Sequence, residues 1–162
     1  MAKDMNEDQQ LRRHLTQLLD WHDAHADFDA AVADIPAEAR GVRPDPLPYS
    51  LWQLLEHVRL AQHDILDFCR NPRYTPPKWP DDYWPETQAP PAADSWQRSV
   101  EAFRADREAL KALVADPAQD LLAEIPHGEG QTLLREVLLA ADHGAYHLGE
   151  VVAVRRLLGV WG

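Results

Sequence analysis

Apolar residues recur every three or four positions in four stretches of the chain, with polar residues between them. In the first stretch these positions form one continuous stripe, made of Leu11, His14, Leu18, Trp21, His25, Phe28 and Val32. Such spacing places side chains on one face of a helix. The pattern predicts a first helix from Glu7 to Val32, followed by a proline-rich segment at residues 35–49 that cannot continue it.

Three further helices are predicted from capping and stop signals. Ser50 is a favourable N-cap, and Gly159 is a natural C-terminal stop. No stretch alternates β-branched and polar residues as a strand would. The class is therefore all-α, a four-helix bundle in a single domain over residues 1–162. The other helices are predicted from Ser50 to Arg70, from Asp94 or Ser95 to Ala115, and from Thr132 to Leu158.

The connection between the second and third predicted helices is long. Residues 72–91 carry seven prolines, together with the aromatic residues Tyr74, Trp79, Tyr83 and Trp84. A loop of this length in a compact domain is usually functional or disordered, and disordered segments are poor in aromatic residues. We expect an ordered crossover strapped over one end of the bundle, serving either as structural packing or as the wall or lid of a pocket.

Charge and composition narrow the function. The formal net charge of −11 argues against binding to nucleic acid or to an anionic membrane surface. The N-terminus lacks the apolar core of a signal peptide, and no stretch reaches about 18 uninterrupted apolar residues, so we expect a cytoplasmic protein. Cys69 is the only cysteine in the sequence, which leaves histidines and carboxylates as the available metal ligands.

Three histidines stand out as candidate ligands. His143 and His147 are spaced i and i+4 in the last predicted helix, so both imidazoles lie on one face and can reach the same ion. His57 lies on the apolar stripe of the second helix, where the simpler interpretation is a hydrogen-bonded core residue. Facing helices of a bundle can supply such ligands together, and three protein ligands leave a position open for chemistry.

Two carboxylates lie near these ligands in the sequence. Asp64 follows His57 by seven residues, and Glu150 follows His147 by three. Each is a candidate further ligand, a partner that fixes an imidazole tautomer, or a general base, while the alternative is an ion pair with a nearby arginine. His25 is expected to face the core, and His63 to face solvent.

The same residues resemble the DinB-like superfamily. The resemblance extends from about Leu11 to Trp161, and its motifs are residues 48–57 (PYSLWQLLEH), 130–132 (GQT), 141–150 (ADHGAYHLGE) and 155–159 (RRLLG). It implies a bundle whose helices run up-up-down-down or in a similar order, with a long crossover between helices two and three. By the resemblance His57, His143 and His147 are the metal triad, which holds nickel, zinc or iron. Homodimers are common in the superfamily.

The resemblance also suggests an activity. Characterised relatives include thiol S-transferases that use bacillithiol or mycothiol, so a low-molecular-weight thiol is the implied second cofactor. Glu150 departs from the glutamine that is common in relatives, and its charge would make water on the metal less acidic. We expect a metal-dependent thiol S-transferase or hydrolase that acts on a small electrophilic substrate, with Glu150 or Asp64 handling protons. The alternative is a non-catalytic dimeric bundle with a structural or relic metal site.

Overall fold

The structure, a computed structural model that describes residues 6–162, is all-helical as predicted. It has five α-helices, and the described residues contain no strand, only an isolated β-bridge between Glu124 and Thr132. Two 3₁₀ turns, η1 and η2, lie in the connections. The elements are α1 (Glu7–Leu18), α2 (Phe28–Val32), η1 (Ala37–Ala39), α3 (Leu51–Arg70), η2 (Asp81–Tyr83), α4 (Ser95–Ala115) and α5 (Leu133–Leu157).

The three long helices α3, α4 and α5 begin and end close to the predicted positions. Ser50 caps α3 by accepting a hydrogen bond from the backbone N–H of Gln53, and the Gln53 side chain accepts from the Ser50 N–H in return. Thr132 caps α5 in a similar way, by accepting from the N–H of Arg135. The local capping chemistry of the sequence therefore sets these boundaries.

The prediction of one continuous first helix is wrong. The chain leaves α1 after Leu18 and re-enters a helix only at Phe28. Asp27 is the N-cap of α2, where its carboxylate accepts from the backbone N–H of Ala30. Asp20 lies in the break and forms ion pairs with Arg107 and Lys111 of α4. The ion pairs of Asp20 and the capping hydrogen bond of Asp27 thus favour a break in the helix, although the spacing of apolar residues over 19–27 is helical.

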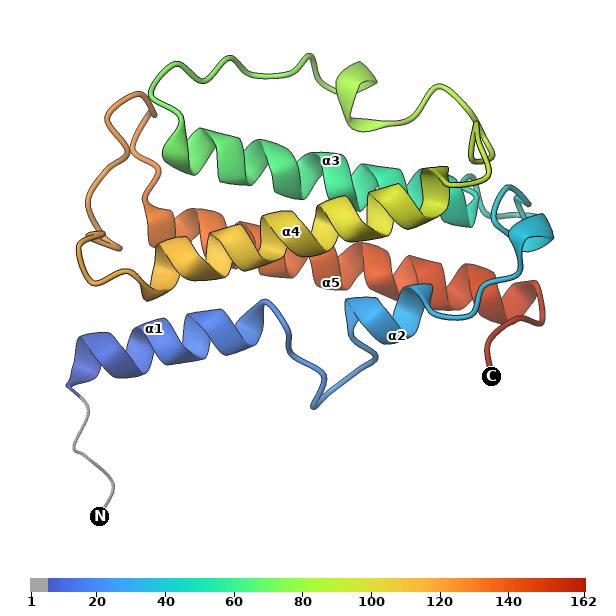
Figure 1. Cartoon of the computed structure of the whole chain (residues 1–162), viewed down its shortest axis with the longest axis horizontal. Helices are drawn as coiled ribbons and strands as arrows, with labels where there is room; N and C mark the ends of the chain where they lie inside the picture. The colour runs from blue at the N-terminus through green and yellow to red at the C-terminus, as the bar shows by residue number, and fades with distance from the viewer. Residues whose placement is uncertain (1–5) are drawn as a thin grey trace.

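Helix direction explains the long crossover. α3 and α4 run parallel to each other, whereas α1 and α5 run in the opposite direction (Figure 1). A 20-residue helix is about 30 Å long, so a chain joining two parallel helices must return over that distance. Residues 71–94 make this return along α3, rather than over one end of the bundle (Figure 1).

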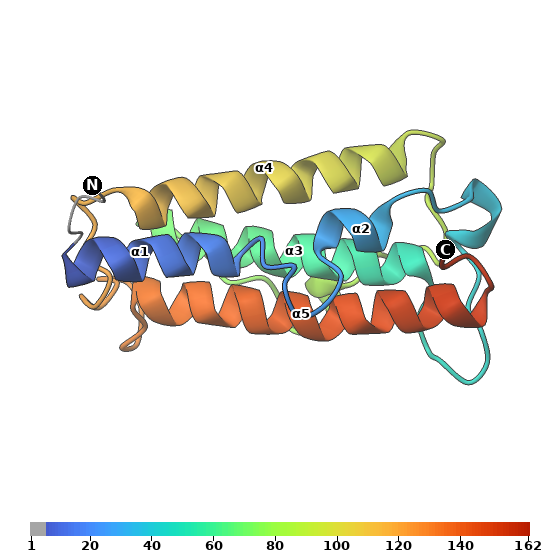
Figure 2. The same cartoon turned by 90° about the horizontal axis from the view of Figure 1, so that it is seen from below.

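The elements form layers around two apolar clusters. α3 packs on α4 and α5, and α1 and α2 cover the opposite side of that pair (Figure 2). One cluster joins α2 to the N-terminal halves of α3 and α4 and the C-terminal half of α5, with Phe28, Leu54 and Val151 among its members. The other joins α1 to the opposite ends and includes Leu15 and Leu110. The candidate ligands lie between α3 and α5.

Candidate metal centre

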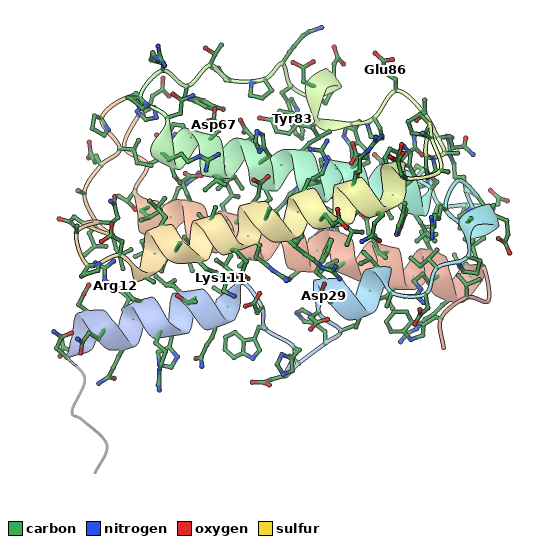
Figure 3. All side chains as sticks on the ribbon, in the orientation of Figure 1. Arg12, Asp29, Asp67, Tyr83, Glu86 and Lys111 are labelled. Carbon is green, nitrogen blue, oxygen red and sulfur yellow. The ribbon has the colours of Figure 1, made fainter. Side chains whose placement is uncertain are left out.

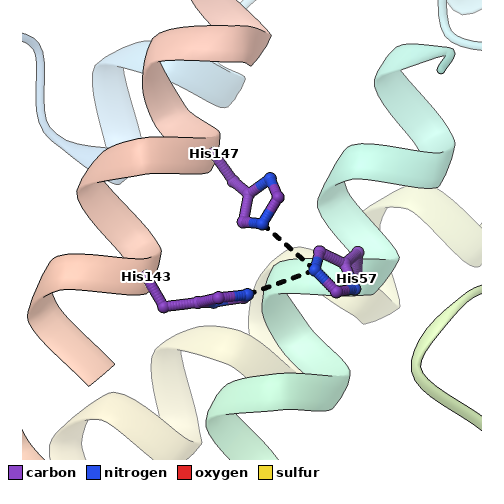
Figure 4. A group of neighbouring side chains, drawn as sticks. All are labelled: His57, His143 and His147. Atoms are coloured by element: carbon purple, nitrogen blue, oxygen red, sulfur yellow. Dashed lines mark hydrogen bonds between the residues drawn. The ribbon is translucent and has the colours of Figure 1, made fainter. Parts of the chain in front are cut away.

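Three histidine side chains converge between α3 and α5. His57 comes from α3, and His143 and His147 come from consecutive turns of α5 (Figure 4). The Nε2 atom of His57 lies 3.1 Å from Nε2 of His147 and 3.1 Å from Nε2 of His143. One ligand atom from each histidine lies within 4.8 Å of the other two. The sequence prediction that these three residues meet is thus confirmed.

The outward-facing nitrogens of two of these histidines are already occupied. Nδ1 of His57 is 2.8 Å from the backbone carbonyl oxygen of Tyr83, which can only accept a hydrogen bond. Nδ1 of His147 is 2.6 Å from a carboxylate oxygen of Glu150. A neutral imidazole carries one proton, so both rings are held in the Nδ1–H tautomer. Their Nε2 lone pairs therefore face each other at the centre of the cluster.

This donor set fits a divalent metal ion. Two bare Nε2 atoms at 3.1 Å repel each other unless a proton or a cation lies between them. Two nitrogens bound to one zinc ion at about 2.05 Å, with an angle of about 100–110°, would be about 3.1–3.4 Å apart. The observed separation between His57 and His147 falls in that range. Imidazole nitrogen is also a ligand that zinc, nickel and iron accept.

The electrostatics keep the ligands neutral. Burial, together with charge repulsion from His147 and His57, lowers the pKa of His143 to about 4. Burial and the proximity of His57 lower the pKa of His147 to about 4 as well. Burial also lowers the pKa of His57, and the hydrogen bond to Tyr83 and the charge of Glu150 oppose that effect only in part. Neutral imidazole is the form that binds metal.

Aromatic stacking fixes the ring of His57. His57 as a whole residue is 2% exposed. Its imidazole lies parallel to the indole of Trp84, with ring centroids 3.9 Å apart and an interplanar angle of 3°. Tyr49 also stacks on Trp84, at 4.1 Å between centroids. His143 is less buried than His57 and His147. The three ligands therefore leave one side of the cluster closer to solvent.

The two predicted carboxylates occupy different places. Glu150 contacts the cluster through His147, and burial raises its pKa. Asp64 instead accepts hydrogen bonds from the phenol groups of Tyr74 and Tyr83, at 2.7 and 2.6 Å. Asp64 is not one of the residues whose ligand atoms converge in the cluster.

The remaining predicted histidines lie outside the cluster. His63 is half-exposed and bonds to Asp106 of α4, in agreement with its predicted solvent-facing position. His25 is exposed in the break between α1 and α2, so the prediction that it faces the core is wrong. The break turns its ring toward its neighbour Ala26, whose carbonyl oxygen is 2.9 Å from Nδ1.

Sequence reasoning did not identify the partners that the crossover supplies to His57. These are the carbonyl of Tyr83 and the ring of Trp84. The aromatic content of residues 72–91 indicated an ordered segment near the bundle. A backbone carbonyl, however, has no residue-type signature, so the sequence could not indicate which residue accepts from His57.

Two cavities lie near these elements. One, of about 440 Å³, lies beside the first part of the crossover and includes Asp64, Tyr74, His127 and Leu139 in its lining. Leu139 is one turn before His143 on α5. The other, of about 550 Å³ and mostly apolar, opens at the break between α1 and α2, and its lining does not include the three histidines.

Of the comparisons with known proteins, the one with protein families found a match. No curated protein and no solved structure matches the chain. Across the described part of the chain, every helix is too short or too polar to cross a membrane. The sequence model of the DinB superfamily matches residues 20–151, a range that contains His57, His143, His147 and Glu150. The match covers most of the chain, and the protein therefore belongs to the DinB superfamily.

Proposed function

We propose that the protein is a metal-dependent enzyme, of the thiol S-transferase or hydrolase type, that acts on a small electrophilic molecule. The observation that carries this proposal is the convergence of three Nε2 atoms, with the rings of His57 and His147 fixed from outside through Nδ1. Three protein ligands leave a position open for a reactant, whereas a structural zinc site is usually closed by four. The half-buried position of His143 supports access to that open side.

His57, His143 and His147 would hold the ion, which we expect to be zinc, nickel or iron. When bound, a divalent ion supplies Lewis acidity that makes a neighbouring thiol or water easier to ionise. Glu150 would orient His147 and hold a proton during the reaction. Its carboxyl group is 33% exposed and has a raised pKa, so it can exchange protons with solvent closer to neutral pH.

The substrate would bind beneath the first part of the crossover. The cavity of about 440 Å³ has a volume suited to a small molecule. Leu139 in its lining is about 6 Å along the α5 axis from His143. A low-molecular-weight thiol is the second reactant of this proposal, because the site offers no cysteine of its own.

We further propose that the molecule is a four-helix bundle, with α1 and α2 together counted as its first helix. We also propose that two copies of the chain form a homodimer. Exposed apolar side chains on α5 offer surface for such an interface, namely Leu138, Tyr146 and Leu157.

The test is the metal content of protein purified without a histidine tag. Wild type should hold about one equivalent of metal, and His143→Ala should hold none, because two ligands bind far more weakly than three. His63→Ala is the matched control, since His63 lies on the same helix as His57 but outside the cluster. Stoichiometric metal in His143→Ala would refute the assignment.

The same preparations separate an enzyme from a non-catalytic bundle. In a cobalt-substituted protein, azide or an added thiol should change the visible spectrum if a coordination position is open. A spectrum that no added ligand changes, together with a large loss of melting temperature in the apo protein, would favour a structural site. Thiol-transfer and hydrolysis assays are then compared between wild type and His143→Ala.

A further inference from the structure

The crossover contributes directly to the position of His57. The carbonyl of Tyr83 accepts the Nδ1 proton of His57, and the next residue, Trp84, stacks on the same imidazole. Tyr83 ends the turn η2, on the segment that lies along α3 (Figure 3). The orientation of a ligand on α3 thus depends on a segment that comes after α3 in the chain.

One carboxylate of α3, that of Asp64, binds this segment at two places. Both oxygens of Asp64 are used, Oδ2 by the hydroxyl of Tyr83 and Oδ1 by the hydroxyl of Tyr74. Asp64 is seven residues after His57, so it lies two turns, about 10 Å, further along the same face of α3. Tyr83 therefore contacts α3 at two points: its phenol binds Asp64 and its carbonyl binds His57.

The phenol and the carbonyl of Tyr83 are therefore both bound to α3, and the helix keeps the distance between its two partners, Asp64 and His57, fixed. Hydrogen bonds from phenols to an ionised carboxylate are short and about twice as strong as neutral ones. Burial, followed by the hydrogen bond to Asp64, raises the pKa of Tyr83, and the same causes raise the pKa of Tyr74. Both phenols consequently keep their protons over the whole physiological range and remain donors.

We propose that Asp64 and Tyr83 are positioning residues for the metal ligand His57. Asp64 holds the phenol of Tyr83, which fixes the Tyr83 carbonyl against Nδ1 of His57. The carbonyl in turn holds His57 in the Nδ1–H tautomer, with the Nε2 lone pair directed at the metal position. This inference rests on the proposed metal site and assigns to Asp64 a role through His57, rather than contact with a reactant.

Tyr74 provides an internal control for this chain of contacts. Its hydroxyl binds the same carboxylate as that of Tyr83, at nearly the same distance. Its backbone N–H bonds to Asn71, and its ring packs on Phe68, at the far end of α3 from His57. Removal of either hydroxyl takes one donor from Asp64, but only Tyr83 has a carbonyl that contacts His57.

The first measurement is the zinc affinity of Tyr83→Phe, Tyr74→Phe and wild type, determined by competition with a chelator. Loss of a partner that orients a metal-binding histidine typically weakens affinity about 10–100-fold. We expect Tyr83→Phe to bind zinc about tenfold more weakly than wild type, and Tyr74→Phe to stay within about twofold. Equal affinities in the two variants would overturn the proposal.

The second measurement uses the metal-free protein, so it does not depend on metal binding. Nitrogen-15 NMR of the imidazole should show His57 as the Nδ1–H tautomer in wild type and in Tyr74→Phe. Tyr83→Phe should show an increased share of the Nε2–H tautomer. An unchanged tautomer in Tyr83→Phe would overturn the proposal even if wild type binds zinc.

The two readouts also separate this inference from the proposed function. If wild type binds no zinc but the tautomer changes as expected, the positioning role stands and the metal proposal fails. If wild type binds zinc and neither readout differs between Tyr83→Phe and Tyr74→Phe, the metal proposal stands and the positioning role fails. A thermal melt of each variant, monitored by circular dichroism, verifies that all are folded.

Discussion

The seam between α3 and α5 and the break between α1 and α2 show opposite responses to polar residues on an apolar stripe. In the seam, His57 and His147 lie among apolar side chains and are buried, because an oxygen atom accepts the hydrogen bond of Nδ1 in each ring. In the break, His25 and Trp21 occupy stripe positions too, yet both are exposed. A polar residue stays in the interior only where its hydrogen-bonding groups are satisfied there.

The difference has a local cause in each region. α3 and α5 pack against each other, so His57 and His147 on the inner faces are shielded from water, whereas His143 is half-buried. The residues between α1 and α2 include acidic side chains with better partners outside a helix. Asp20 pairs with arginine and lysine on α4, and Asp27 caps α2. Helical periodicity therefore has less influence there than capping and ion pairing.

The largest expected effect is on the free energy of unfolding, and it compares a buried residue of α3 with an exposed residue of the break. Leu54 is 1% exposed on α3, and Leu54→Ala should lower the free energy of unfolding by about 3 kcal/mol, because it leaves a cavity in the core. Trp21 is 49% exposed in the break, and Trp21→Ala should lower it by no more than about 1 kcal/mol. Urea titration of the metal-free proteins measures both. Equal losses would mean that the break is packed as firmly as the core.

The second effect tests whether metal stabilises only the seam. Zinc at about 100 times its dissociation constant should raise the free energy of unfolding of wild type by about 2.7 kcal/mol. His147→Ala should gain almost nothing. Asp27→Ala removes the cap of α2 and should cost about 1 kcal/mol, yet its gain from zinc should equal that of wild type. The same gain in His147→Ala would place zinc outside the seam.

These contrasts explain what the sequence could predict. Ser50 is the N-cap that was expected, and α5 begins after Thr132, where a helix was expected to start, because capping depends on neighbouring residues only. The meeting of His57 with His143 and His147 followed from helical faces and from the family resemblance. The bonds of Asp64 to Tyr74 and Tyr83, and that of His57 to a carbonyl, join residues whose distance depends on the path of the crossover. Periodicity carries no information about that path.

The smallest expected effect concerns the ion pairs that hold α2 against α4. Asp29 on α2 bonds to Arg104 and Arg107 of α4, and Figure 3 shows Asp29 between these helices. Burial by itself would raise the pKa of Asp29, but the hydrogen bonds and charges of the two arginines outweigh it, so the pKa lies below 3.8. The folded protein thus binds a proton here less readily than the unfolded chain.

The stabilisation from Asp29 is therefore fully present above pH 3.8 and is lost as the pH falls through the lower folded pKa. The side chain is 41% exposed, so solvent screening keeps this contribution below about 1 kcal/mol. Asp29→Asn should be less stable than wild type by that amount at pH 7, and the difference should narrow as the pH falls below 3.8. Urea titrations of both metal-free proteins over this range measure it. A difference that stays constant with pH would show that Asp29 acts through packing rather than charge, so that α2, like the seam, depends on buried contacts.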